Sequence, residues 1–223
     1  MAEEAPTKAG FVALIGAPNA GKSTLLNALV GSKVSIVSRK VQTTRALVRG
    51  IAVAGAAQIV FVDTPGIFKP KRRLDRAMVT SAWGGAGDAV ALLLDARKGV
   101  DEEADAILAR LPELKQPKVL ILNKIDLIER SKLLELASRL NEKVPFAHTF
   151  MVSALNGDGT DRLLAELAKM MPEGPWLYPE DQISDAPLRM LAAEITREKI
   201  YERLHEELPY QSTVETDQWT EQK

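Results

Sequence analysis

The chain has 223 residues, with 29 Lys and Arg against 30 Asp and Glu, and it contains no cysteine. These numbers exclude a disulfide-stapled secreted scaffold, a cysteine-ligated metal site and a protein that is polycationic as a whole. Hydrophobic residues make up 46% of the chain, which is enough for a sizeable core in one full domain and a smaller piece. Because no apolar run approaches the roughly 20 residues of a membrane span and no signal peptide is visible, we expect a cytoplasmic protein.

Short apolar runs alternate with helix-like segments up to residue 172. The sequence predicts helices at 22–30, 102–111, 131–141 and 160–171, and the runs between them are apolar on both faces, as in a parallel sheet covered by helices: 11–15, 59–62, 89–94, 119–122 and 150–152. A further strand at 47–53 can pair with the 59–62 run as an antiparallel hairpin at one edge. The pattern predicts an α/β fold with a mostly parallel six-stranded sheet and helices on both faces.

The composition divides the chain into four parts. We expect a flexible N-terminus at 1–8, a first domain at 9–172 and, because prolines and acids gather there, a semi-rigid linker at 173–187. Residues 188–208 have helical spacing and residues 211–219 alternate weakly like a half-exposed strand. One helix and one strand cannot easily close a core, so 188–223 is predicted to be part of a second, α+β domain.

The strongest motif follows the first predicted strand and opens the first predicted helix. It consists of Gly16, Ala17, Pro18, Asn19, Ala20, Gly21, Lys22 and Ser23, with Thr24 continuing the helix. The glycines let backbone N–H groups turn toward phosphate oxygens, Lys22 supplies a cation for the terminal phosphates, and Ser23 offers a hydroxyl to Mg²⁺. The pattern in this context predicts a phosphate-binding loop, or P-loop.

A second motif, Asp63-Thr64-Pro65-Gly66, ends the 59–62 strand at the same edge of the sheet. Asp63 can hold Mg²⁺ through a water molecule, and the Gly66 N–H can reach a γ-phosphate without interference from a side chain. Between the two motifs, Thr44, favoured over Thr43, can bind Mg²⁺ through its hydroxyl and sense the γ-phosphate.

Two further motifs indicate which base is bound. After the 119–122 strand, Asp126 can accept hydrogen bonds from N1–H and the N2 amino group of guanine, whereas adenine has no matching pair of donors. The Lys124 stem can lie along the base plane, while Asn123 braces the loops. Ser153, Ala154 and Leu155 end the last strand, where the Ala154 N–H can meet guanine O6. These loops favour GTP over ATP.

The four loops, in this order, resemble those of the translation-factor class of GTPases. Three stretches of sequence closely resemble the bacterial Era family: the P-loop, Ser38-Arg39-Lys40-Val41-Gln42-Thr43-Thr44-Arg45 and the Asp-Thr-Pro-Gly-Ile stretch. In addition, the start of that family's C-terminal KH domain resembles residues 179–185, 194–199 and 207–210. The resemblance implies a P-loop NTPase G domain followed by a partial KH-type segment at 188–223, and slow GTP hydrolysis. The implied site comprises Lys22, Thr44, Asp63 and Gly66, with Mg²⁺ on Ser23, Thr44 and, through water, Asp63.

The resemblance also implies partners. Full-length members would bind 16S ribosomal RNA and the 30S subunit, assist maturation of the small subunit, and allow a peripheral contact with the inner membrane; we expect a monomer. The chain ends at Lys223 before any Gly-x-x-Gly loop of the kind that clamps RNA in KH modules, so RNA binding is predicted to be weakened or lost. Ile67 follows Gly66 where many small GTPases carry a glutamine that orients the attacking water. Isoleucine cannot do this.

Alternatives stay open at this point. Asn19 is either a ligand of a potassium ion, as in related GTPases, or a turn-forming residue. The whole chain is open to interpretation as a P-loop kinase of a small metabolite, as a tRNA-modification-type GTPase, or as an RNA-binding assembly module that holds nucleotide without significant hydrolysis. The guanine motif argues against the kinase, and single-turnover phosphate release separates the last alternative from a GTPase.

Overall fold

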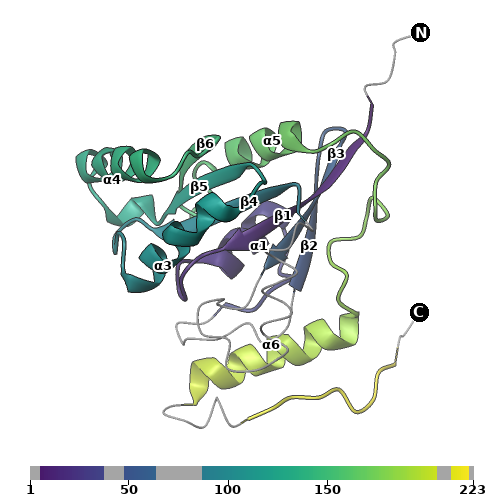
Figure 1. Ribbon diagram of the computed structural model, residues 1–223. Coiled ribbons are helices and arrows are strands. Elements are labelled where there is room, and N and C mark those ends of the chain that lie inside the picture. Colours follow the sequence, from purple (N-terminus) through teal and green to yellow (C-terminus); the bar gives the residue numbers. More distant parts are fainter. Residues whose placement is uncertain (1–5, 38–47, 64–86, 205–211, 221–223) are drawn as a thin grey trace.

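The fold is built on one six-stranded sheet, seen in a computed structural model that describes residues 6–37, 48–63, 87–204 and 212–220 (Figure 1). The strands are β1 (Lys8–Ile15), β2 (Val48–Ala54), β3 (Ala57–Asp63), β4 (Ala89–Asp95), β5 (Lys118–Asn123) and β6 (His148–Val152). Their order is β2-β3-β1-β4-β5-β6, and only the β2–β3 pair is antiparallel. The predicted mostly parallel sheet with an edge hairpin is confirmed.

Helices cover both faces of this sheet (Figure 1). They are α1 (Lys22–Val30), α3 (Glu102–Arg110), α4 (Arg130–Lys143) and α5 (Thr160–Met170). A further helix, α6 (Leu188–Arg203), lies outside these two layers, and there are two short 3₁₀ turns, η1 (Leu111–Glu113) and η2 (Ile125–Leu127). The predicted helix at 22–30 is matched, and the bounds of the other three predicted helices of the first domain differ by at most two residues. Helix α6 ends at Arg203, five residues before the expected end.

Alternate residues of the central strands enter two separate cores. In β5, Val119 and Ile121 pack with α1 and α5, whereas Leu120 and Leu122 pack with α3 and α4. Side chains of successive strand residues point to opposite faces, so a strand buried on both sides has to be apolar throughout. This explains why the apolar runs predicted the strands correctly.

The segment at 173–187, expected to be a semi-rigid linker, instead docks along strands β2 and β3. Gln58 of β3, fully buried, accepts hydrogen bonds from the backbone N–H groups of Leu177 (2.8 Å) and Tyr178 (2.9 Å) and donates to the Tyr178 carbonyl (2.8 Å). Farther along, the Ile51 N–H donates to the Ile183 carbonyl at 2.9 Å. Backbone pairing of this kind covers a sheet edge, so we call residues 173–187 the strap.

The N-terminal boundary also differs from expectation. Strand β1 begins at Lys8, whose N–H donates to the Ala56 carbonyl at 2.9 Å, so the predicted flexible segment does not extend to residue 8. The Thr7 hydroxyl donates to the Gly174 carbonyl at 2.9 Å, and the Thr7 carbonyl accepts the Gly174 N–H at the same distance. The start of the strap therefore holds the start of β1.

Helix α6 lies below the sheet, against the chain that follows α1 (Figure 1). Its Glu198 is buried, pairs with the Lys33 ammonium and accepts the Val37 N–H at 2.9 Å. The expected strand at 211–219 is wrong, because residues 212–220 form neither helix nor strand. An alternating pattern makes a strand only where a neighbouring strand accepts its backbone hydrogen bonds, and here Thr216 instead donates its hydroxyl to the Arg189 carbonyl.

Among the described helices, none is both long enough and apolar enough to cross a membrane.

Replacing Gln58 by Met tests the docking of the strap, because the new side chain keeps most of the volume but makes none of the hydrogen bonds. We expect the free energy of unfolding to fall by about 1–3 kcal/mol, since two backbone N–H groups lose the acceptor that the buried Gln58 side chain provides. Urea unfolding measures this. Amide hydrogen exchange should also accelerate at Leu177 and Tyr178; unchanged exchange there would contradict the docking.

Candidate nucleotide-binding site

The predicted site residues that the structure describes gather at one edge of the sheet. Strands β1, β3, β5 and β6 run in the same direction, so the loops that follow them open at their shared carboxyl ends, the edge where open α/β sheets bind ligands. In this register Leu14 lies beside Asp63, which brings the P-loop next to the end of β3. Thr44, Thr64, Pro65, Gly66 and Ile67 lie outside the described residues.

The P-loop runs from Gly16 to Gly21, and the predicted Lys22, Ser23 and Thr24 form the first turn of α1. Lys22 folds back across the loop and donates to the carbonyls of Gly16 (2.8 Å) and Ala17 (3.1 Å). Gly16 has to be glycine, since a Cβ there would lie 2.3 Å from the Leu93 carbonyl oxygen. The loop thus packs tightly on β4 and surrounds the amino end of a helix, where anions bind favourably.

Electrostatics at the loop also favour an anion. Burial lowers the pKa of Lys22 below its ordinary value, and the nearby carboxylates of Asp63 and Glu103 raise it only in part. A lowered pKa means that the surroundings disfavour the ammonium form. A phosphate group in the loop would restore that form by placing negative charge beside it.

Ser23 and Asp63 form the part of the predicted metal site that the structure describes. The Ser23 hydroxyl donates to Asp63 Oδ2 at 3.0 Å, and Asp63 is fully buried at the end of β3. A hydroxyl and a carboxylate side by side are hard oxygen donors of the kind that Mg²⁺ takes, so the pair fits this ion. In the described ranges no three His, Cys, Asp or Glu side chains form a metal cluster.

Asn123 connects three loops at the other end of the site. Its side chain is buried; Nδ2 donates to the Ala20 carbonyl at 2.9 Å and Oδ1 accepts the Ala154 N–H at 3.0 Å. The predicted bracing role therefore has a definite geometry. In this structure the Ala154 N–H pairs with Asn123, so its predicted contact with guanine O6 stays a prediction.

Asp126 is held by the loop that follows β6. The Ser153 hydroxyl donates to Asp126 Oδ1 at 2.6 Å, while Asp126 itself is exposed in the turn η2. Leu155, the last residue of the predicted base-contacting loop, is 80% exposed. The serine therefore orients one oxygen of the carboxylate, and the group remains accessible to a base.

Two strained residues meet in this site. Asn19 and Lys124 are the non-glycine residues with positive φ in the described part of the chain, at 61° and 65°, and the Lys124 ammonium donates to the Asn19 carbonyl at 2.7 Å. Such conformations persist only where surrounding contacts fix them, and they gather at functional sites. The positive φ of Asn19 agrees with its interpretation as a turn residue; a potassium-binding role stays a prediction.

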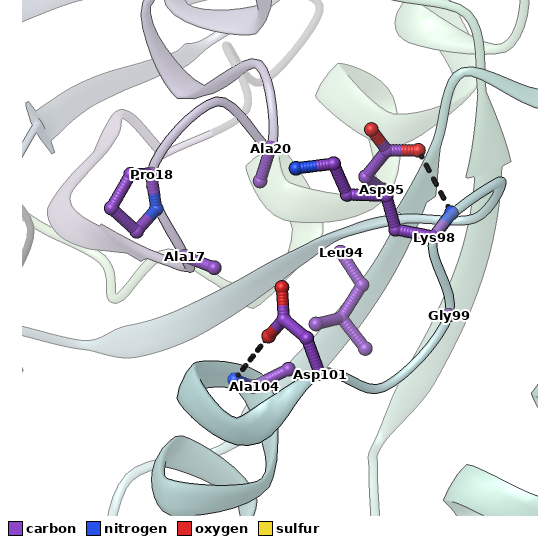
Figure 2. A pocket seen from close by; sticks show the side chains of 9 residues that line it. All are labelled: Ala17, Pro18, Ala20, Leu94, Asp95, Lys98, Gly99, Asp101 and Ala104. Atoms are coloured by element: carbon purple, nitrogen blue, oxygen red, sulfur yellow. Dashed lines mark hydrogen bonds between the residues drawn. The ribbon is translucent and has the colours of Figure 1, made fainter. Parts of the chain in front are cut away.

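Sequence analysis gave no role to Asp95, the last residue of β4. Asp95 lines a small hollow between the P-loop and the turn that follows β4, together with Ala17, Pro18, Ala20, Leu94, Lys98, Gly99, Asp101 and Ala104 (Figure 2). Its carboxylate also contacts the Lys124 ammonium at 2.6 Å. The sequence did contain a signal for such a role, because Asp95 is an acid at the end of an otherwise apolar, buried strand.

The strand order, the P-loop and the loops at the carboxyl edge define a P-loop GTPase. The family model of the 50S ribosome-binding GTPases matches residues 11–124. GTPase Era of Afipia carboxidovorans is 71% identical over 220 residues, which cover 98% of this chain and 71% of that protein. The chain belongs to the Era family of GTPases, which are GTP hydrolases.

Solved structures agree with this assignment. Era in complex with MgGDPNP and nucleotides 1506–1542 of 16S ribosomal RNA matches with a TM-score of 0.84 at 42% identity, over 92% of this chain and 70% of that one. An Aquifex aeolicus Era variant bound to GDP·AlF₄⁻ matches with a TM-score of 0.82 at 41% identity, over 91% of this chain and 70% of that one.

Comparing Gly21→Ala with Gly31→Ala tests the Asn123 brace. Both glycines have positive φ, so alanine costs about 1–2 kcal/mol at either position. At Gly21 the new Cβ would lie 2.4 Å from Asn123 Nδ2, whereas nothing lies within 4 Å at Gly31. We expect urea unfolding to show a further loss of about 1–3 kcal/mol for Gly21→Ala alone, with weakened nucleotide binding. Equal effects at the two positions would contradict the brace.

Proposed function

We propose that this chain is a guanine-nucleotide switch that binds GTP and GDP with Mg²⁺ and slowly hydrolyses GTP to GDP and phosphate. The observation that carries the proposal is the Asn123 side chain, which ties the P-loop to the loops after β5 and β6. Through it, a phosphate-binding end and a base-binding end belong to one site.

The phosphate end supplies charge stabilisation and no nucleophile. Lys22 and the N–H groups of the P-loop would hold the phosphoryl oxygens, Ser23 and Thr44 would bind Mg²⁺ directly, and Asp63 would act through a water molecule. The ion, when bound, neutralises charge on the β- and γ-phosphate oxygens. Water attacks the γ-phosphorus, the bond to the β–γ bridging oxygen breaks, and its electron pair leaves with GDP.

Hydrolysis without a partner should be slow. Small GTPases that carry the water-orienting glutamine turn over at roughly 10⁻⁴ s⁻¹ unstimulated, and this chain has Ile67 at the corresponding place. An isoleucine side chain has no hydrogen-bonding group. We therefore expect a comparable or lower intrinsic rate, with the water positioned by the backbone, by a group near Thr44 or Gly66, or by a partner.

The base end selects guanine. Asp126, oriented by Ser153, accepts hydrogen bonds from N1–H and the N2 amino group, and Lys124 covers the base plane. The wrong base leaves the carboxylate unpaired, which can reduce binding by a factor on the order of 10⁴. GTP and GDP are therefore the expected ligands.

We also infer a role in maturation of the small ribosomal subunit through 16S ribosomal RNA. Support comes from the relative crystallised with nucleotides 1506–1542 of that RNA, which this chain matches over 92% of its length. The test is nucleotide-dependent pelleting with 30S subunits. This chain should be compared with a version extended by the remaining residues of the Afipia relative, which should pellet more strongly. A cytoplasmic location and a peripheral contact with the inner membrane are part of the same proposal.

Lys22→Ala should abolish GTP turnover, because the buried cation that faces the terminal phosphates is lost. Single-turnover phosphate release measures this and also separates a GTPase from a module that only holds nucleotide. Lys132→Ala serves as the control, since the Lys132 side chain is 66% exposed on α4. Full phosphate release by Lys22→Ala would contradict the proposed site.

Asp126→Asn should shift base preference from guanine to xanthine. The amide can still accept from N1–H, but it donates where the carboxylate accepted, and xanthine presents an oxygen at that position. Competition between GDP and XDP for a fluorescent nucleotide measures the preference. We expect at least a hundredfold change in the ratio of the two affinities. An unchanged ratio would show that Asp126 does not recognise the base.

A further inference from the structure

Asp95 ends β4 outside the four nucleotide motifs, and its two carboxylate oxygens have different partners. Oδ1 accepts the backbone N–H groups of Arg97 (3.1 Å) and Lys98 (3.3 Å), which closes the turn that follows the strand; the second of these contacts is drawn in Figure 2. Oδ2 accepts the Lys124 ammonium at 2.6 Å. The carboxylate is 4% exposed and the lysine side chain 28% exposed. A buried carboxylate with a cationic partner is therefore shared between a turn and the base-binding loop.

Lys124 is fixed at both ends of its side chain. Its backbone has a positive φ of 65°, and its ammonium donates to Asp95 and to the carbonyl of Asn19. Because Asn19 belongs to the P-loop, the Lys124 side chain links the end of β5 to that loop. A lysine without such anchors would sample other rotamers and lose this arrangement.

We propose that Asp95 is a positioning residue of the guanine-nucleotide site: by holding the Lys124 ammonium, it keeps the lysine stem in place as a wall of the base pocket. The inference rests on the proposed function and adds a residue to it. Asp126, which selects the base, is oriented separately by Ser153 at 2.6 Å. Asp95 therefore controls how long the nucleotide stays bound, and Asp126 controls which base is accepted.

Asp95→Asn separates the two contacts of Asp95. The asparagine oxygen can still accept the N–H groups of Arg97 and Lys98, which preserves the turn, but the amide nitrogen then faces the Lys124 ammonium as a second donor. We expect dissociation of fluorescently labelled GDP to become about tenfold faster, equivalent to about 1.4 kcal/mol. The matched control is Asp101→Asn. Asp101 lines the same hollow but caps α3 through the Ala104 N–H (2.8 Å), a role that asparagine fills equally well.

Two further readouts distinguish positioning from general damage. In a Lys124→Met background, which keeps an apolar stem without the ammonium, Asp95→Asn should change the dissociation rate by less than about twofold. Asp95→Asn should also accelerate the dissociation of GDP and of IDP by the same factor, because the base of IDP differs from guanine only in lacking the N2 amino group that Asp126 recognises.

The inference is overturned if Asp95→Asn leaves GDP dissociation within about twofold of the parent protein. It is also overturned if Asp95→Asn gives the same tenfold acceleration of GDP dissociation in the Lys124→Met background. Loss of discrimination between GDP and IDP in Asp95→Asn would overturn it as well. A parent protein that binds no GDP would instead refute the proposed function, and the inference with it. Binding by the parent together with an unaffected Asp95→Asn refutes the inference alone.

Discussion

The hydrogen bonds of one buried amide, that of Asn123, are the constraint on which the nucleotide site depends. The three loops follow different strands, and ordering each loop residue costs about 1–2 kcal/mol of backbone entropy. Asn123 offsets part of this entropy loss before a ligand binds, because its side-chain amide is hydrogen-bonded to both Ala20 and Ala154. The same contact explains Gly21, where a Cβ would occupy the space of the amide nitrogen. Gly21 leaves the space that the Asn123 amide occupies, so the two residues together preorganise the loops.

Charge is distributed in this site so that the ligand completes it. Lys22 donates to two P-loop carbonyls, and burial lowers its pKa. Asp63 is buried beside Ser23, a pair suited to a cation that the protein side chains of the described ranges do not fully enclose. A triphosphate with its magnesium ion brings both missing charges together. The geometry thus favours a metal-bound nucleotide over either component alone.

Local pattern predicted the parts of this structure that depend on neighbours in sequence. Strands that are apolar on both faces, and a P-loop between a strand and a helix, are each specified by a few neighbouring residues. Their positions could therefore be predicted. Gln58 and Tyr178 lie 120 residues apart, and no local pattern shows that a buried strand glutamine will hold the strap. Asp95 was missed for the same reason, since Lys124 reaches it from another strand. The expected strand at 211–219 was wrong, because alternation of polar and apolar residues indicates a half-exposed surface but does not provide a neighbouring strand to pair with. Thr44 and Gly66, outside the described residues, stay predictions.

The strap and α6 contact the chain on both sides of the segment that carries Thr44. After that segment, Arg49 pairs with Asp185 at 3.0 Å, but the arginine side chain is 40% exposed, so this ion pair contributes little. Before it, Glu198 is 3% exposed and takes both the Lys33 ammonium and the Val37 N–H. Breaking a buried, hydrogen-bonded charge costs several times more than breaking an exposed pair. Of these two ion pairs, the one of Glu198 therefore contributes more to holding the C-terminal segment on the G domain. If Val37 moves, either α6 moves with it or the buried Glu198 carboxylate loses its backbone hydrogen bond.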